Sequence, residues 1–168
     1  AESSIKNLLK PNESIIVENF IKGIELSSIY ICNPNASKKT IGLPWVKDYK
    51  SRDEYNSGPN TGGMGAITHP YCSFKKNDVY SLNTEIEKII IKTIVSINNS
   101  SGDQSNYNGF LYLGLMISTE DNKPYLLEYN CRMGDPETQN LMMYLYNNDV
   151  DFLDLIGFNN SEYPDNFN

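Results

Sequence analysis

Residues 126–139 have the sequence LLEYNCRMGDPETQ and combine a strand, two oxygen-bearing side chains, an arginine and the start of a helix. Side chains alternate across a β-strand, so Glu128 and Asn130 are expected on the same face. A carboxylate beside an amide oxygen suits Mg²⁺ or Mn²⁺ better than Zn²⁺, and Arg132 can hold an anion. The stretch therefore points to an Mg²⁺-dependent reaction on phosphates. Two polar side chains on a solvent-facing strand are the alternative interpretation.

The second half of this stretch predicts a helix. Asp135 is a natural N-cap and Pro136 a natural first helical residue, so a helix is expected to run from there to about Asn147. The free N–H groups of its first turn can face an anion. Simple capping by Asp135 is the alternative.

The composition describes a folded, acidic chain. It has 168 residues, enough for one domain, with 39% hydrophobic residues and a net charge of −7. This charge argues against nucleic-acid and anionic-membrane partners, although a few local cations suffice for a nucleotide. Three widely spaced cysteines disfavour a disulfide framework or a zinc site, and the expected location is cytoplasmic. A start at Ala1 rather than Met suggests a processed, excised or incomplete polypeptide.

Hydrophobic periodicity predicts an α+β fold in which an antiparallel sheet packs against helices. The clearest helix is 78–98, capped by Asn77 or Asp78, with shorter helices expected at 2–9 and 149–156. The expected strands are 14–20, 25–32, 40–46, 110–117 and 124–130.

A polar segment at 48–65 interrupts these elements and ends in GPNTGGMG. Four glycines and a proline in eight residues predict an irregular loop. Loops of this length in compact domains are usually functional or disordered. Backbone N–H groups without a neighbouring Cβ can approach a ligand closely. A mobile surface loop is the alternative.

The glycine loop, the run GFLYLGLM at 109–116 and the 126–139 stretch together resemble the phosphoribosylamine–glycine ligases in order and spacing. These are ATP-grasp enzymes of purine biosynthesis. The resemblance implies that 1–157 form the second part of an ATP-grasp core. It implies that 158–168 are a tail or the start of a truncated C-terminal region. The family's N-terminal domain, the core half with the phosphate-binding lysine and the C-terminal domain have no counterpart here.

The resemblance also implies roles for individual residues. Glu128 and Asn130 match the metal pair, and Arg132 matches a catalytic arginine near the transferring phosphate, with a salt bridge to a nearby carboxylate as the plainer role. Glu25 is expected at the ribose of ATP, and the backbone of Glu18, Asn19 and Phe20 at the adenine. The expected substrate-binding residues are Asp48, Lys50, Gly58, Pro59, Asn60, Thr61, Gly62, Gly63, Met64, Gly65, Asp135, Pro136, Glu137 and Thr138.

Three positions depart from the family pattern. Tyr49 stands where the family usually has histidine, Ser51 where it has arginine, and Asn19 where it has a second acid. The only histidine, His69, is expected outside the site, which leaves no Ser–His–Asp or Cys–His constellation.

The reaction implied is the ATP-dependent ligation of glycine to 5-phosphoribosylamine through a glycyl phosphate, with Mg²⁺ or Mn²⁺. The partners implied are ATP, glycine, 5-phosphoribosylamine and the remaining parts of the same enzyme. Another ATP-grasp carboxylate–amine ligase and a non-catalytic fragment or binding module are the alternatives.

Overall fold

The computed structural model describes residues 14–34, 40–69, 74, 76–100 and 106–157. The expected helix at 2–9 and the expected tail at 158–168 lie outside these residues. Among the helices of the described part, none is long and apolar enough to span a membrane.

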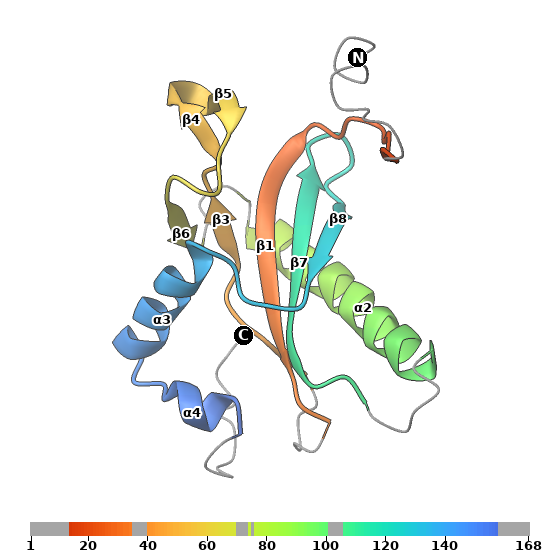
Figure 1. The fold of residues 1–168 in the computed structure, drawn as a ribbon, viewed down its shortest axis with the longest axis vertical. Coiled ribbons are helices and arrows are strands. Elements are labelled where there is room, and N and C mark those ends of the chain that lie inside the picture. Colours follow the sequence, from red (N-terminus) through yellow and green to blue (C-terminus); the bar gives the residue numbers. More distant parts are fainter. Residues whose placement is uncertain (1–13, 35–39, 70–73, 75, 101–105, 158–168) are drawn as a thin grey trace.

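A six-stranded sheet forms the centre of the fold (Figure 1). Its strands run in the order β6-β3-β1-β7-β8, with β2 also paired to β1, and every pairing is antiparallel. The strands are β1 Gly23–Cys32, β2 Thr40–Gly42, β3 Val46–Asp48, β6 Ala66–Thr68, β7 Gly109–Ser118 and β8 Pro124–Asn130. The predicted α+β class is confirmed.

Helices cover both faces of the sheet. The helix α2, Lys76–Ser100, buries Leu82, Ile86 and Ile90 against one face, which confirms the predicted apolar stripe. On the other face, α3 (Glu137–Asn147) and α4 (Phe152–Leu155) pack through Leu141, Leu145 and other apolar residues (Figure 1). Strand alternation divides β1 between the two cores, because Leu26 and Tyr30 face α2 whereas Ile29 and Ile31 face α3 and α4.

Two strand predictions are wrong. Residues 14–22 form no strand, and Ile16, Val17 and Phe20 are largely exposed, because this apolar run meets no sheet edge among the described residues. The strand predicted at 40–46 is instead two strands, β2 and β3. The break between them contains Pro44, which has no N–H to donate to a ladder.

The prediction of an irregular loop over the whole of 48–65 is also wrong. Its first part is a small hairpin of β4 Ser51–Asp53 and β5 Ser57–Asn60, joined by the short helix η1 Glu54–Asn56. The hairpin projects beyond β3 and β6 (Figure 1). Gly58 has φ +78, and its missing Cβ leaves room for the Asp53 carboxylate. Residues 61–65 stay irregular, as expected.

Helix boundaries differ from the predicted ones by a few residues. Pro136, not Asp135, occupies the N-cap of α3, and no side chain caps that end. Asp135 instead accepts a hydrogen bond from Gln139 Nε2 at 2.8 Å. Because α2 begins at Lys76, Asn77 and Asp78 lie in its first turn rather than at its cap.

Candidate functional site

The sheet face opposite α2 carries the polar residues of the candidate site and is called the site face. Its neighbouring positions are Glu25 and Ser27 on β1, Tyr112 and Gly114 on β7, and Glu128 and Asn130 on β8. The register pairs Gly114 with Glu128 and Tyr112 with Asn130, so the last two residues share a face, as strand alternation predicted.

A β-bulge fixes which side chains of β8 reach the site face. Leu115 pairs with Leu126 while Gly114 pairs with Glu128, so Leu127 is an extra residue in β8. The bulge lets Leu126 pack into the α2 core although Glu128, two residues later, points the opposite way. Strand alternation alone would have placed both on one face.

Gly114 allows Glu128 to lie close to the sheet. A Cβ on Gly114 would be 2.9 Å from Glu128 Cγ, closer than real Cβ contacts. The glycine therefore leaves space for the Glu128 side chain over β7. Sequence reasoning missed this role, because cross-strand neighbours are not visible in a single sequence.

Lys50 and Glu25 form an ion pair that links the expected substrate segment to the expected ATP segment. Lys50 Nζ donates to Glu25 Oε1, and both side chains are only partly exposed. Burial disfavours the charged ammonium, but the hydrogen bond to Glu25 and the charges of Glu25, Asp48 and Glu128 outweigh burial and raise the pKa of Lys50. Lys50 is therefore a fixed positive charge.

Residues 61–65 are held against residues 49 and 50. The backbone N–H and the hydroxyl of Thr61 both donate to the Lys50 carbonyl, at 2.7 and 2.9 Å. The Thr61 hydroxyl oxygen also accepts from Gly63 N at 3.1 Å. Tyr49 exchanges backbone hydrogen bonds with Met64 and Gly65. These bonds attach the loop to the two residues that follow β3.

Gly63 brings the glycine loop into contact with the 126–139 stretch. A Cβ on Gly63 would lie 2.5 Å from Pro136 Cδ and 3.3 Å from both Asp135 O and Asp48 Oδ1. Gly63 also has φ +136, which favours glycine. The two motifs, far apart in the sequence, therefore meet at one point.

Asp48 lies at this meeting point. Its Oδ1 is buried and has no hydrogen-bond partner. Burial, followed by the negative charge of Glu137, raises the pKa of Asp48 to about 6, although nearby Lys50 acts in the opposite direction. The carboxyl group therefore changes charge near neutral pH.

The side chain of Glu137, which the family resemblance placed among the substrate-binding residues, is buried in the structure. This side chain is 2% exposed. Its Oε1 accepts hydrogen bonds from Ser27 Oγ at 2.8 Å and from Tyr112 Oη at 3.0 Å. Gly134 lies against the carboxylate and has no Cβ to displace it. The first turn of α3 is thus tied to β1 and β7, and residues 131–136 cross the site face on the way from β8 (Figure 1).

The structure gives the other predicted residues only local contacts or exposed positions. Arg132 is exposed and donates to the Met133 carbonyl at 2.9 Å. Thr138 donates its hydroxyl to the Gly134 carbonyl. Also exposed are Gly58, Pro59 and Asn60 on β5, Gly62 and Met64 in the loop, and Glu18, Asn19 and Phe20 before β1.

Glu128 and Asn130 fit a divalent cation of the Mg²⁺ type, since both supply oxygen donors from one face. Within the described residues, no group of three or more His, Cys, Asp and Glu side chains could hold a metal ion. The pair therefore supplies only part of a coordination sphere, as expected for a cation that keeps waters and phosphate oxygens.

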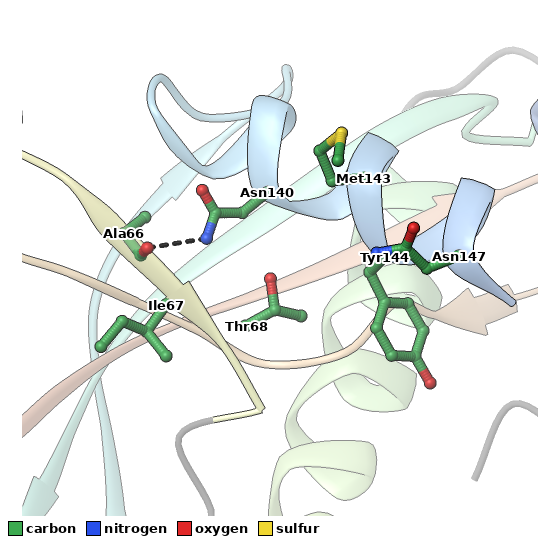
Figure 2. Close-up of a pocket in the computed structure, with 7 residues that line it drawn as sticks. All are labelled: Ala66, Ile67, Thr68, Asn140, Met143, Tyr144 and Asn147. Atoms are coloured by element: carbon green, nitrogen blue, oxygen red, sulfur yellow. Dashed lines mark hydrogen bonds between the residues drawn. The ribbon is translucent and has the colours of Figure 1, made fainter.

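An open groove lies beside the site, between β6 and α3 (Figure 2). Asn140 Nδ2 donates to the Ala66 carbonyl at 2.7 Å and joins the helix to this strand. The His69 ring packs on Tyr144 with centroids 4.5 Å apart, and burial lowers the pKa of this histidine. In β6, Thr68 pairs with Val46 and Ala66 pairs with Asp48. His69 follows Thr68, at the end of β6 away from Asp48.

The fold and the site define an ATP-grasp protein. The structure is similar to the crystal structure of a phosphoribosylamine–glycine ligase from Thermotoga maritima, with a TM-score of 0.61 and 37% identity. That similarity covers 75% of this chain and 29% of the other. The family described as phosphoribosylglycinamide synthetase, ATP-grasp (A) domain, matches residues 2–138, and the chain belongs to this family.

Curated relatives carry the same name. The phosphoribosylamine–glycine ligase of Clostridium acetobutylicum is 36% identical over 156 residues, which are 90% of this chain and 33% of that protein. The Escherichia coli protein of that name is 34% identical, over 85% of this chain and 32% of that protein. The chain thus spans about a third of the length of these relatives.

Proposed function

We propose that this chain supplies part of the active site for the ATP-dependent ligation of glycine to 5-phosphoribosylamine. The products would be glycinamide ribonucleotide, ADP and phosphate. The observation that carries the proposal is the contact of Gly63 with Pro136 and Asp48. This contact brings the glycine loop next to residues 126–139, which supports a site where a phosphate donor and a second substrate react together.

The site face supplies oxygen ligands and positive charge for phosphoryl transfer. Glu128 and Asn130 would hold Mg²⁺ or Mn²⁺, which neutralises charge on ATP phosphates when bound. Lys50 and Arg132 would supply positive charge near this face, and Arg132 is exposed and able to reach an anionic substrate. Catalysis through a glycyl phosphate needs positioning and charge stabilisation rather than a protein nucleophile.

The remaining expected contacts extend this proposal. Glu25 would receive the ribose hydroxyls of ATP beside Lys50, and the backbone at Glu18, Asn19 and Phe20 would contact the adenine. Exposed Gly58, Pro59, Asn60, Gly62 and Met64 would contact phosphoribosylamine together with Thr61 and Gly65. Asp135, Pro136 and Thr138 would face the transferring group. We also propose a cytoplasmic location, as expected for purine biosynthesis.

The test is an assay on an enzyme that contains this chain. ADP formation should require ATP, glycine, phosphoribosylamine and a divalent cation together, and titrations with Mg²⁺ and Mn²⁺ should show which cation supports turnover. Omitting each substrate in turn is the control. ATP turnover with another carboxylate and amine, but not with glycine, would assign the chain to another ATP-grasp ligase. Nucleotide binding without turnover would favour a binding module.

A further inference from the structure

Joining an amine to an acyl phosphate requires a group that accepts a proton. The amine nitrogen forms a bond to the carbonyl carbon, the bond from that carbon to the phosphate oxygen breaks, and phosphate leaves with the electron pair. The nitrogen then carries one proton more than an amide holds. A carboxylate close to the attacking amine can take this proton.

Besides Asp48, four ionisable groups lie at or beside the meeting point of the two motifs, and each is unsuited to this role. The Asp135 carboxylate already accepts a hydrogen bond from Gln139 Nε2 at 2.8 Å. Lys50 is charged and already carries its proton. Glu25 is engaged by Lys50. Glu137 is enclosed, and two hydroxyl groups donate to its Oε1. Asp48 differs from these groups, because its side chain is only half-buried and its Oδ1, although buried, has no hydrogen-bond partner.

We propose that Asp48 is the proton acceptor for the attacking amine, an inference that rests on the proposed function. Its carboxylate lies beside Gly63 of the glycine loop and near Pro136 of the 126–139 stretch. The proton passes from nitrogen to an Asp48 oxygen and then to solvent, which restores the carboxylate.

The surroundings of Asp48 suit a base that works near neutral pH. Burial and the charges of Glu137 on α3 and Glu25 on β1 raise its pKa, and Lys50 lowers it, with a resulting value of about 6. Because Lys50 donates to Glu25 rather than to Asp48 Oδ1, it does not occupy the oxygen that would receive the proton. A base with a pKa near the working pH is both ionised and able to accept a proton.

The experiment separates the two halves of the reaction in an enzyme that contains this chain. ATP labelled with ¹⁸O in the β–γ bridge scrambles its label when glycine is phosphorylated reversibly, without any amine. Asp48→Asn should keep this glycine-dependent scrambling and reduce amide formation about 10²–10⁴-fold. Asp121→Asn, an exposed residue in the turn between β7 and β8, is the matched control and should leave both reactions unchanged.

The possible outcomes separate the inference from the function on which it rests. Absence of glycine-dependent ADP formation by the unaltered enzyme with all substrates present would refute the proposed function itself. Equal loss of both half-reactions in a folded Asp48→Asn enzyme would assign Asp48 to glycine binding and overturn the inference, as would unchanged amide formation.

A second variant tests the inference without altering Asp48. Glu137→Gln keeps an oxygen for the Ser27 and Tyr112 hydroxyls but removes the negative charge that raises the pKa of Asp48. The rate of amide formation, which should fall below about pH 6 in the unaltered enzyme, should then fall only at lower pH. If the acidic limb of the pH–rate profile does not move in Glu137→Gln, Asp48 is not the proton acceptor. This measurement tests the proposal even if Asp48→Asn does not fold.

Discussion

The substitution Gly63→Ala tests whether the contact between the two motifs is needed. The new Cβ would lie 2.5 Å from Pro136 Cδ, a ring atom that has no rotamer by which to move away. Backbone in a region that side chains rarely adopt costs about 1–3 kcal/mol, and overpacking costs a similar amount. Since the loop can shift and relieve part of the contact, we expect a loss of about 2–4 kcal/mol in the free energy of unfolding.

Thermal and urea unfolding of the chain, followed by circular dichroism, measure this loss. For a chain of this size, the expected loss lowers Tm by about 5–15 °C. Gly62→Ala is the matched control. A Cβ at that position meets nothing within 4 Å and the residue is exposed, so its Tm should change little.

Turnover in an enzyme that contains the chain gives a second measurement. If the loop contacts phosphoribosylamine, Gly63→Ala and the bulkier Gly63→Val should raise KM for this substrate more than KM for ATP. Equal stability of the Gly62 and Gly63 variants would refute the contact as described. An effect confined to ATP would place the loop on the nucleotide side of the site.

Three further predictions follow from the site. Glu128→Ala should reduce metal-dependent turnover by at least about 100-fold, and unchanged activity across an Mg²⁺ titration would remove the metal assignment. The pKa of Asp48 is about 6 in the folded chain and roughly 4 in an unfolded chain. The stability that protonated Asp48 contributes is therefore present at low pH and is lost as the pH rises through 6. Asp48→Asn should therefore be more stable than the unaltered chain at pH 8 and equal to it near pH 4. Urea unfolding measures the difference in the free energy of unfolding between the two chains, and a difference that does not change with pH would contradict the raised pKa. The purified 168-residue chain should show little ligase activity, and robust glycine-dependent phosphate release would overturn this expectation.

Local patterns predicted much of the architecture. The apolar stripe at steps of three and four residues predicted α2, since helical geometry alone places those side chains on one face. Two apolar runs joined by a polar turn predicted β7 and β8, and strand alternation predicted the common face of Glu128 and Asn130. The strand predicted at 14–20 is wrong, because a β-branched apolar run forms a strand only where a neighbouring strand supplies hydrogen bonds.

The amino-acid sequence by itself determined the fold class, the family and the shared face of Glu128 and Asn130, because each depends on residue types at fixed spacing. Only the tertiary structure decided which groups are paired, enclosed or left without a partner. It joins Lys50 to Glu25, encloses Glu137 beneath two hydroxyl groups and leaves Asp48 Oδ1 beside Gly63. These relations join residues far apart in the chain, and desolvation and charge interaction depend on distance in space rather than on position in the sequence.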